Sequence, residues 1–333
     1  MSRPTVLFLH ANGFPSGSYR QFLEALGRHA EVIAPPALDT PSSMRPRLRW
    51  PDMTRQVVTE LRRLAEHHGP VCLVGHSMGG YLSMMAAARL PAHVRHVVLI
   101  DSPIVVGWRQ SLLETLSLTG LSRRGGPAPI AARRRDRWAS PEFAHAYFSA
   151  KAFVRDWAPG VLDDFLAHAL AAGQDGAMTL RIAREAERDI YAHLPARRTH
   201  AAFRALRSHG GIGLHLIAGT RSRETEMAGR AINRRLFGAN WHELATGHLV
   251  PMEKPIACAE LVARCIGAVH DGSPGDVLDG LSTSPSNARH DIPQSLQDRD
   301  GGPGASLRPV ARHGQSVHGG DRRRRRLRLA AHR

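Results

Sequence analysis

The chain has 333 residues, of which 42% are hydrophobic, and it carries a formal net charge of +16. This length and composition exclude a wholly disordered protein and allow one large domain with an insertion, or two small domains. No apolar run approaches the roughly 20 residues that a membrane-spanning helix needs, so we expect no membrane association.

Short apolar runs rich in β-branched residues alternate with longer helical patterns along the chain. This alternation predicts an α/β fold, an open and mostly parallel sheet of about six strands with helices on its faces. The strands are expected at residues 5–10, 31–34, 71–75, 96–101, 214–218 and 241–244. The helices between them are expected near residues 18–29, 51–67, 77–90 and 255–269.

The alternation stops after Asp101 and resumes near residue 214. We expect residues 1–102 and 211–270 to form the core, with residues 103–210 inserted as a helical cap without strands. A cap in this place would stand over the carboxyl ends of the strands, where open α/β sheets bind ligands. Its helices are expected at residues 108–121, 141–149, 161–172 and 178–193, with a loop at 123–135. Its many aromatic residues suit either an apolar pocket or the core of the cap itself.

Residues 271–333 are rich in Gly, Pro, Ser, Asp and Arg and lose the apolar periodicity, which predicts a disordered basic tail. The tail is either native or the product of a shifted reading frame in a GC-rich gene. Its arginine run, residues 322–326, could bind phosphates weakly. It has no interleaved aromatic residues, so a solvated charge run is favoured over a nucleic-acid site.

The strongest chemical signal is VCLVGHSMGG at residues 71–80, where an apolar strand runs into G-x-S-x-G and a helical pattern follows. Such a turn would force Ser77 into a strained backbone conformation with its hydroxyl in the site. Gly75 and Gly79 would leave room where a side chain would collide with backbone. The Met78 N–H would face a developing oxyanion. We therefore predict that Ser77 is a nucleophile.

A serine nucleophile needs a base, and His248 is placed to be that base. It follows the last predicted strand and Gly247, and it precedes the final helix. Other histidines fit less well. His76 is expected to point away around the turn, and His10 to be structural or to line the site.

Three segments together resemble the α/β-hydrolase superfamily: GHSMGG at 75–80, HANGF at 10–14 and GHLVPMEKP at 247–255. The similarity is greatest to lid-bearing members such as esterases, epoxide hydrolases and haloalkane dehalogenases, and it covers about residues 5–269. The resemblance implies that the inserted segment is the cap of that family.

The resemblance also implies the rest of the oxyanion hole and part of the substrate site. The backbone N–H of Asn12, or that of Ala11 or Gly13, would complete the oxyanion hole with Met78. The candidates for lining the substrate are His10, Gly13, Phe14 and Trp108.

The acid departs from the family pattern. Many members carry an aspartate after the strand that follows the cap, but the matching residue here is Ser222. Asp101, at the end of the strand after the nucleophile helix, is one substitute, and Glu224 is another. Asp101 could instead simply stabilise the turn into Ser102. We favour Asp101, because the acid must be a buried carboxylate bonded to the imidazole.

A serine at position 77 excludes the dehalogenases and epoxide hydrolases, which use aspartate. The resemblance implies a carboxylesterase-like serine hydrolase that cleaves a small to medium ester or thioester through an acyl-enzyme. An acyltransferase or lyase on the same fold is one alternative. A non-catalytic binding protein with a nucleic-acid-binding tail is another.

The sequence predicts neither a cofactor nor a metal, because it has no nucleotide loop, HExxH motif or paired-cysteine site. The apolar run at residues 6–9 is too short for a signal peptide, and the three cysteines suit free thiols. We therefore expect a cytoplasmic enzyme with a small-molecule substrate. The sequence does not indicate an oligomeric state.

Overall fold

The computed structural model describes residues 3–38, 43–124 and 127–268. Its main sheet has six strands, all parallel, in the order β2-β1-β3-β4-β8-β9. Their bounds are β1 (Thr5–Leu9), β2 (Glu31–Ile33), β3 (Val71–His76), β4 (Val94–Ile100), β8 (Gly213–Gly219) and β9 (Trp241–Leu244). The predicted α/β fold with a mostly parallel sheet is confirmed. The predicted tail, residues 271–333, lies outside the described residues.

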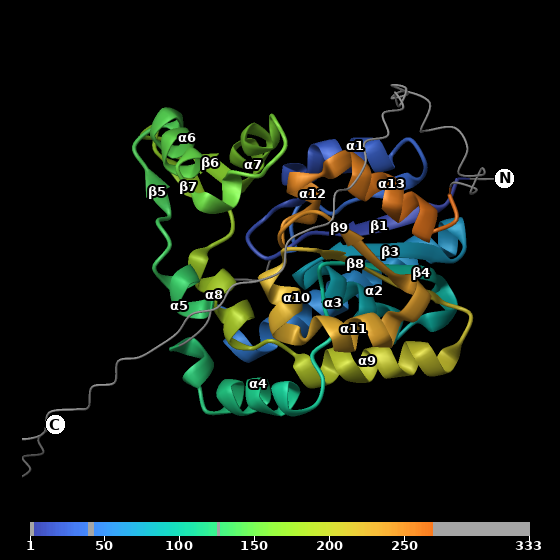
Figure 1. Ribbon diagram of the computed structural model, residues 1–333. Helices are drawn as coiled ribbons and strands as arrows, with labels where there is room; N and C mark the ends of the chain where they lie inside the picture. The colour runs from blue at the N-terminus through green and yellow to red at the C-terminus, as the bar shows by residue number, and fades with distance from the viewer. Residues whose placement is uncertain (1–2, 39–42, 125–126, 269–333) are drawn as a thin grey trace, which may run out of the picture. The chain divides into compact units, whose positions relative to one another are not determined.

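Helices cover both faces of this sheet (Figure 1). One face packs against α1 (Arg20–Leu26) and α13 (Pro255–Cys265). The other face packs against α2 (Arg49–His68), α3 (Met78–Ala87), α9 (Ala196–His209) and α11 (Arg230–Phe237). The short helices α10 (Arg223–Ala228) and α12 (Val250–Glu253) follow β8 and β9. The sequence analysis did not predict α9, α10 or α11.

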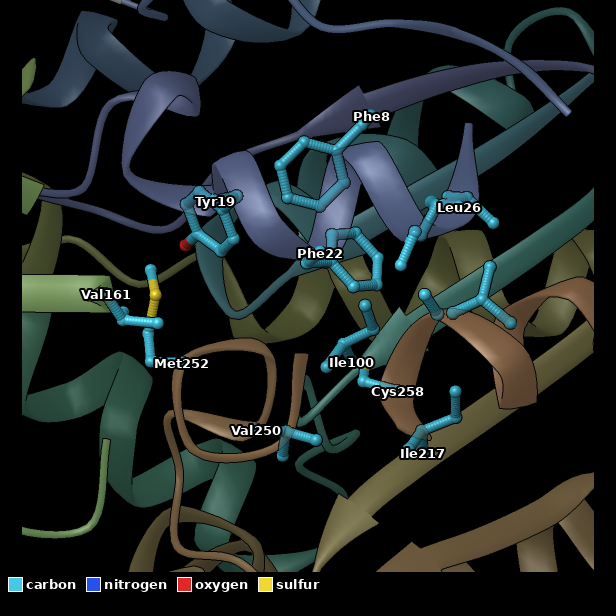
Figure 2. Close-up of a cluster of buried hydrophobic side chains, with 14 of the residues drawn as sticks. Phe8, Tyr19, Phe22, Leu26, Ile100, Val161, Ile217, Val250, Met252 and Cys258 are labelled. Atoms are coloured by element: carbon cyan, nitrogen blue, oxygen red, sulfur yellow. The ribbon is translucent and has the colours of Figure 1, made fainter. Parts of the chain in front are cut away.

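Two buried clusters hold these layers together, because successive side chains of a strand point to opposite faces. On β4, Val98 and Ile100 belong to the cluster under α1 and α13, whereas Val97 and Leu99 belong to the other. Figure 2 shows the first cluster, in which aromatic side chains from β1 and α1 meet Ile100, Ile217 and helix α13. No helix within the described ranges is both long and apolar enough to cross a bilayer.

The segment between β4 and β8 is not wholly helical. Its helices are α4 (Trp108–Leu118), α5 (Pro127–Ala132), α6 (Pro141–Ser149), α7 (Val161–Ala169) and α8 (Arg184–Ala192), followed by α9. They are interrupted by a small antiparallel sheet of β5 (Arg137–Trp138), β6 (Leu170–Ala172) and β7 (Met178–Leu180). The prediction of an insertion without strands was therefore wrong. Strands of two or three residues are too short to show the alternation by which a strand is recognised.

The aromatic residues of this segment divide between core and surface. Trp138, Phe148 and Phe165 are fully buried and extend the cluster under α1 and α13. Phe143 and Phe153 are exposed. The buried set therefore lies in a core that the segment shares with the main sheet, which differs from the expectation that these side chains form a core of the segment itself.

The junction of β3 and α3 is packed too tightly for side chains at its glycines. A Cβ on Gly79 would lie 2.0 Å from the carbonyl oxygen of Leu9, and one on Gly75 would lie 2.3 Å from the backbone of Gly79. The predicted need for glycine at both positions is confirmed. Backbone contact of this kind fixes α3 against the end of β1.

We expect Gly79→Ala to lower the free energy of unfolding by about 3 kcal/mol or more, since backbone must move to admit the methyl group. Gly120→Ala is the matched control, because Gly120 has a φ of +75° but open space around its Cα. There only backbone strain remains, which costs about 1 kcal/mol. Urea unfolding of the purified variants measures both values, and equal losses would contradict the packing argument.

Candidate active site

Ser77 lies between β3 and α3 in a strained backbone conformation, with a φ of 52° and a ψ of −113°. Among the described residues, Ser77 and Asp101 are the two with positive φ that are not glycine. Such conformations cost roughly 1–3 kcal/mol and cluster at functional sites. Both residues directly follow strands that are neighbours in the sheet, β3 and β4.

His248 joins these two residues. It lies in the loop between β9 and α12, and its Nε2 is 3.1 Å from the Oγ of Ser77. Its Nδ1 is 2.6 Å from the Oδ2 of Asp101. The structure therefore brings together the predicted nucleophile, base and first-choice acid in one hydrogen-bonded row.

Asp101 is 1% exposed and sits among donors. Its Oδ1 accepts from the N–H of Gly219 and from the hydroxyl of Thr225, each at 2.9 Å. Its Oδ2 accepts from the hydroxyl of Ser222 at 2.5 Å, in addition to the imidazole of His248. Ser222, which occupies the usual position of the acid, thus donates to an acid that comes from the neighbouring strand.

Glu224 lies close to the same imidazole but in a different environment. Its Oε2 is 3.7 Å from the Nδ1 of His248, and its side chain is 48% exposed. The Asp101 side chain is fully buried and more than 1 Å closer. Glu224 therefore acts on His248 through its charge, at a distance beyond that of a hydrogen bond.

The pKa values of the pair move in opposite directions. Burial alone would raise the pKa of the Asp101 carboxyl, but hydrogen bonds from His248, Ser222 and Gly219 hold it below its usual range. Burial alone would lower the pKa of His248, but the hydrogen bond and charge of Asp101, with a smaller effect of Glu224, raise it above 6.5. Asp101 is therefore ionised at neutral pH, and its charge favours an imidazolium at His248.

A chain of hydrogen bonds that could not be predicted from the sequence holds the backbone carbonyl of His248. The hydroxyl of Tyr19 accepts from the N–H of Ala11 at 3.0 Å and lies 2.8 Å from the Nδ1 of His76. The Nε2 of His76 lies 3.0 Å from the carbonyl oxygen of His248. The expectation that His76 points away from the site was wrong, because its buried ring lies 5.2 Å from that of His248, centroid to centroid.

Burial lowers the pKa of His76 to about 3, so this ring is neutral and donates through only one nitrogen. Donation from Nε2 to the carbonyl of His248 leaves Nδ1 to accept the hydroxyl proton of Tyr19. No local pattern in the sequence marks Tyr19, since the chain brings it beside His76 only on folding.

Some of the backbone N–H groups predicted to bind an oxyanion near Ser77 are already used in other hydrogen bonds. Met78 is the first residue of α3, so its N–H has no acceptor within the helix. The N–H of Ala11 already donates to Tyr19, which leaves those of Asn12 and Gly13 among the predicted donors. The side-chain amide of Asn12 donates to the carbonyl oxygen of Glu187 on α8, at 3.0 Å. That side chain therefore holds the loop to the inserted segment.

Two of the expected lining residues are corrected. His10 is fully buried, with its Nδ1 2.8 Å from the carbonyl oxygen of Ala11 and its Nε2 2.6 Å from the N–H of Leu38, so its role is structural. Trp108 is 67% exposed at the start of α4, a helix with no buried residue, and Arg109 lies over its ring. It faces solvent because α4 stands off the core.

The other two expected lining residues lie under the inserted segment. Gly13 has a φ of +78°, and a Cβ there would meet the carboxylate of Glu187 at 3.2 Å and the guanidinium of Arg134 at 3.3 Å. Arg134 and Glu187 form a largely buried ion pair at 2.9 Å. Phe14 packs on Phe165, with 5.3 Å between ring centroids. Both residues contact the inserted segment directly.

The oxygens and nitrogen of Asp101, Glu224 and His248 lie within 4.8 Å of one another, so this group could also hold a metal ion. In this structure, however, the Nδ1 of His248 is hydrogen-bonded to Asp101, and its Nε2 is hydrogen-bonded to Ser77. The atoms that could bind a metal ion therefore take part in the hydrogen-bonded row. The arrangement is suited to moving a proton from the Ser77 hydroxyl to Nε2 of His248.

Comparison with known proteins agrees with the α/β fold. A family model described as the alpha/beta hydrolase family matches residues 6–261. The fold resembles an E-2-(acetamidomethylene)succinate hydrolase, with a TM-score of 0.62, 20% identity and coverage of 80% of this chain and 92% of that one. It also resembles a thioesterase domain of the curacin biosynthetic pathway, with a TM-score of 0.59, 17% identity and coverage of 78% and 91%.

A third similar structure is an esterase of M. tuberculosis, with a TM-score of 0.55, 21% identity and coverage of 80% of this chain and 86% of that one. Likeness at these identities shows the fold alone. A 1-acylglycerol-3-phosphate O-acyltransferase of Arabidopsis thaliana is 30% identical over 109 residues, which is 30% of this chain. The chain spans about a quarter of the length of that relative and of a probable one from rice, Oryza sativa subsp. japonica.

Proposed function

The chain belongs to the alpha/beta hydrolase family, and we propose that it is a serine hydrolase that cleaves a carboxylic ester or thioester. One observation carries the proposal. The Oγ of Ser77, both nitrogens of His248 and the carboxylate of Asp101 form a continuous hydrogen-bonded row. Its first and last members are the two described non-glycine residues with positive φ.

The reaction follows from these contacts. The Oγ of Ser77 attacks the carbonyl carbon while Nε2 of His248 takes its proton, and Asp101 stabilises the imidazolium. The N–H groups of Met78 and of Asn12 or Gly13 bind the resulting oxyanion. His248 then gives its proton to the leaving alcohol or thiol, which departs and leaves an acyl-enzyme. Water, deprotonated by His248, attacks this ester and releases the acid and Ser77.

Several features support a small to medium substrate held under a cap. The segment 103–210 contacts the loop at Asn12 and Gly13 through Glu187, and its aromatic core reaches Phe14. We therefore propose that this segment is a cap that shapes the acyl site, while residues 1–102 and 211–270 form the core. The three described cysteines are buried free thiols, which supports a cytoplasmic location.

Ser77→Ala is expected to abolish labelling by a fluorophosphonate probe and to lower kcat on an activated ester by about 10⁵-fold or more, because Ser77 carries the hydroxyl that is hydrogen-bonded to His248. The control is Ser83→Ala on α3, the helix that follows Ser77. The buried Ser83 hydroxyl has no hydrogen-bond partner in the described part of the chain, so its loss leaves labelling unchanged. Gel fluorescence and steady-state kinetics measure both effects. Labelling that persisted in Ser77→Ala would overturn the assignment.

Asp101→Asn and Glu224→Gln separate the two carboxylates. Removing Asp101 is expected to lower kcat by roughly 10⁴-fold, because the imidazole loses its orientation and its counter-charge. Glu224→Gln retains kcat within about threefold.

The pH profile gives a second readout of the same pair. His248 accepts a proton only when neutral, so wild-type kcat/KM falls on acidification, with a midpoint above pH 6.5. The Glu224 charge helps to raise this pKa, so Glu224→Gln moves the midpoint to lower pH. A large loss of kcat in Glu224→Gln, with activity retained in Asp101→Asn, would reverse the assignment.

Acyl transfer is a second candidate, favoured by the partial similarity to the two acyltransferases. It shares every step up to the acyl-enzyme and differs in the acceptor. Product analysis with a thioester substrate and a competing alcohol distinguishes the two reactions. Hydrolysis predicts free acid as the main product at low millimolar alcohol, whereas an acyltransferase would give mainly the new ester.

A further inference from the structure

Three histidines form a row across the main sheet, far from Ser77. They are His96 on β4, His215 on β8 and His242 on β9, which are consecutive strands of the sheet. The ring centroids of His96 and His215 are 6.0 Å apart. The rings of His215 and His242 are stacked, with 5.7 Å between their centroids. The row lies toward the amino ends of these strands, whereas Ser77 and Asp101 follow carboxyl ends.

Cys265, the last residue of α13, completes the group. The nitrogens of His215 and His242 and the thiol sulfur of Cys265 lie within 4.8 Å of one another. The Nδ1 of His215 is 3.4 Å from the Nε2 of His242. Two imidazole nitrogens bound tetrahedrally at about 2.0–2.1 Å from a zinc ion are themselves about 3.4 Å apart. The two rings are thus already spaced as ligands of one ion.

The charge of Arg264 opposes a cation at this group, whereas burial keeps both imidazole rings neutral and able to bind one. Burial, with a contribution from neighbouring histidines, lowers the pKa of His215 to about 4. Burial and the charge of Arg264 also lower the pKa of His242. Both rings are therefore neutral at neutral pH, with a lone pair to donate. Burial raises the pKa of the Cys265 thiol to about 12, so it would lose its proton only on binding a metal ion.

His96 lies beside the ring of His215, with 6.0 Å between the ring centroids. The Nδ1 of His96 is buried and has no hydrogen-bond partner among the described residues. Both this nitrogen and the Nε2 of His215 lie within 3.2 Å of the point where a Cβ on Gly213 would be. A metal on Nδ1 of His215 would place the proton on its Nε2, and a hydrogen bond to the Nδ1 of His96, absent from this structure, would then form. Metal-bound histidines commonly donate their second N–H in this way.

We propose that His215, His242 and Cys265 bind a zinc ion, with a fourth position left for water and with His96 orienting His215. Two imidazoles and a thiolate are ligands that zinc favours. The ion would join β8 and β9 to the end of α13, and it would stabilise the packing of the last helix on the sheet. The site is independent of the proposed serine hydrolase activity.

The test uses the full chain after treatment with a chelator. Zinc titration by calorimetry is expected to show one tight equivalent, and cobalt, as a spectroscopic substitute, to give a thiolate-to-metal charge-transfer band. Cys265→Ala is expected to lose that band and to weaken zinc binding about 100-fold. The matched control is Cys258→Ala, which removes the other buried thiol of α13 and retains both signals. His96→Ala is expected to weaken binding about tenfold without losing the band.

Stability gives a second readout. Zinc is expected to raise the Tm of the wild type and of Cys258→Ala, but not that of Cys265→Ala. If Cys265→Ala fails to fold, His242→Gln serves in its place, with far-ultraviolet circular dichroism to check folding. Absence of a saturable zinc site in the wild type would overturn the proposal. Zinc binding that is unchanged in Cys265→Ala and in His242→Gln would also overturn it. Fluorophosphonate labelling tests Ser77 separately, so either proposal can fail alone.

Discussion

A buried carboxylate charge is costly unless donors surround it, and Asp101 meets that requirement with groups from three different segments. The N–H of Gly219 comes from the end of β8, the hydroxyls of Ser222 and Thr225 come from the start of α10, and the imidazole of His248 comes from the loop after β9. These donors lie 118 to 147 residues after Asp101 in the chain and converge on its side chain. Displacing any of them would leave a charge buried without its partners.

The same requirement explains why the usual acid position holds a serine. The Ser222 oxygen is 2.5 Å from the carboxylate of Asp101, so an aspartate there would bring two buried carboxylates together. Like charges so close cannot both remain ionised. A single carboxylate directly after β4, with a hydroxyl in the position usual for the acid, is ionised and keeps its full set of donors. Glu224 is compatible with this arrangement because it lies farther away and is exposed.

Features carried by contiguous residues could be predicted from the sequence, and features created by strand order could not. The turn at Ser77 is visible because strand, glycines and helix follow one another, and His248 is visible because it follows the last strand. The link from Tyr19 through His76 depends on contacts across 57 residues, and the choice of Asp101 over Glu224 depends on burial. The histidine row becomes visible only once β4, β8 and β9 are known to be neighbours.

The three members of the proposed catalytic row are held in place in different ways. The strained Ser77 and Asp101 extend the sheet ladder, because their N–H groups donate to the carbonyls of Ile100 and Ile217 at 2.9 Å and 2.7 Å. His248 lies in a loop and does not directly follow a strand. Its loop is held by His76 at its carbonyl and by the Glu253 carboxylate, which accepts from the N–H of Gly247 at 2.9 Å. The proposed base, His248, therefore depends on side-chain hydrogen bonds for its position, whereas the proposed nucleophile and acid depend on the sheet. Weakening Tyr19, His76 or Glu253 would loosen the base while leaving the other two in place.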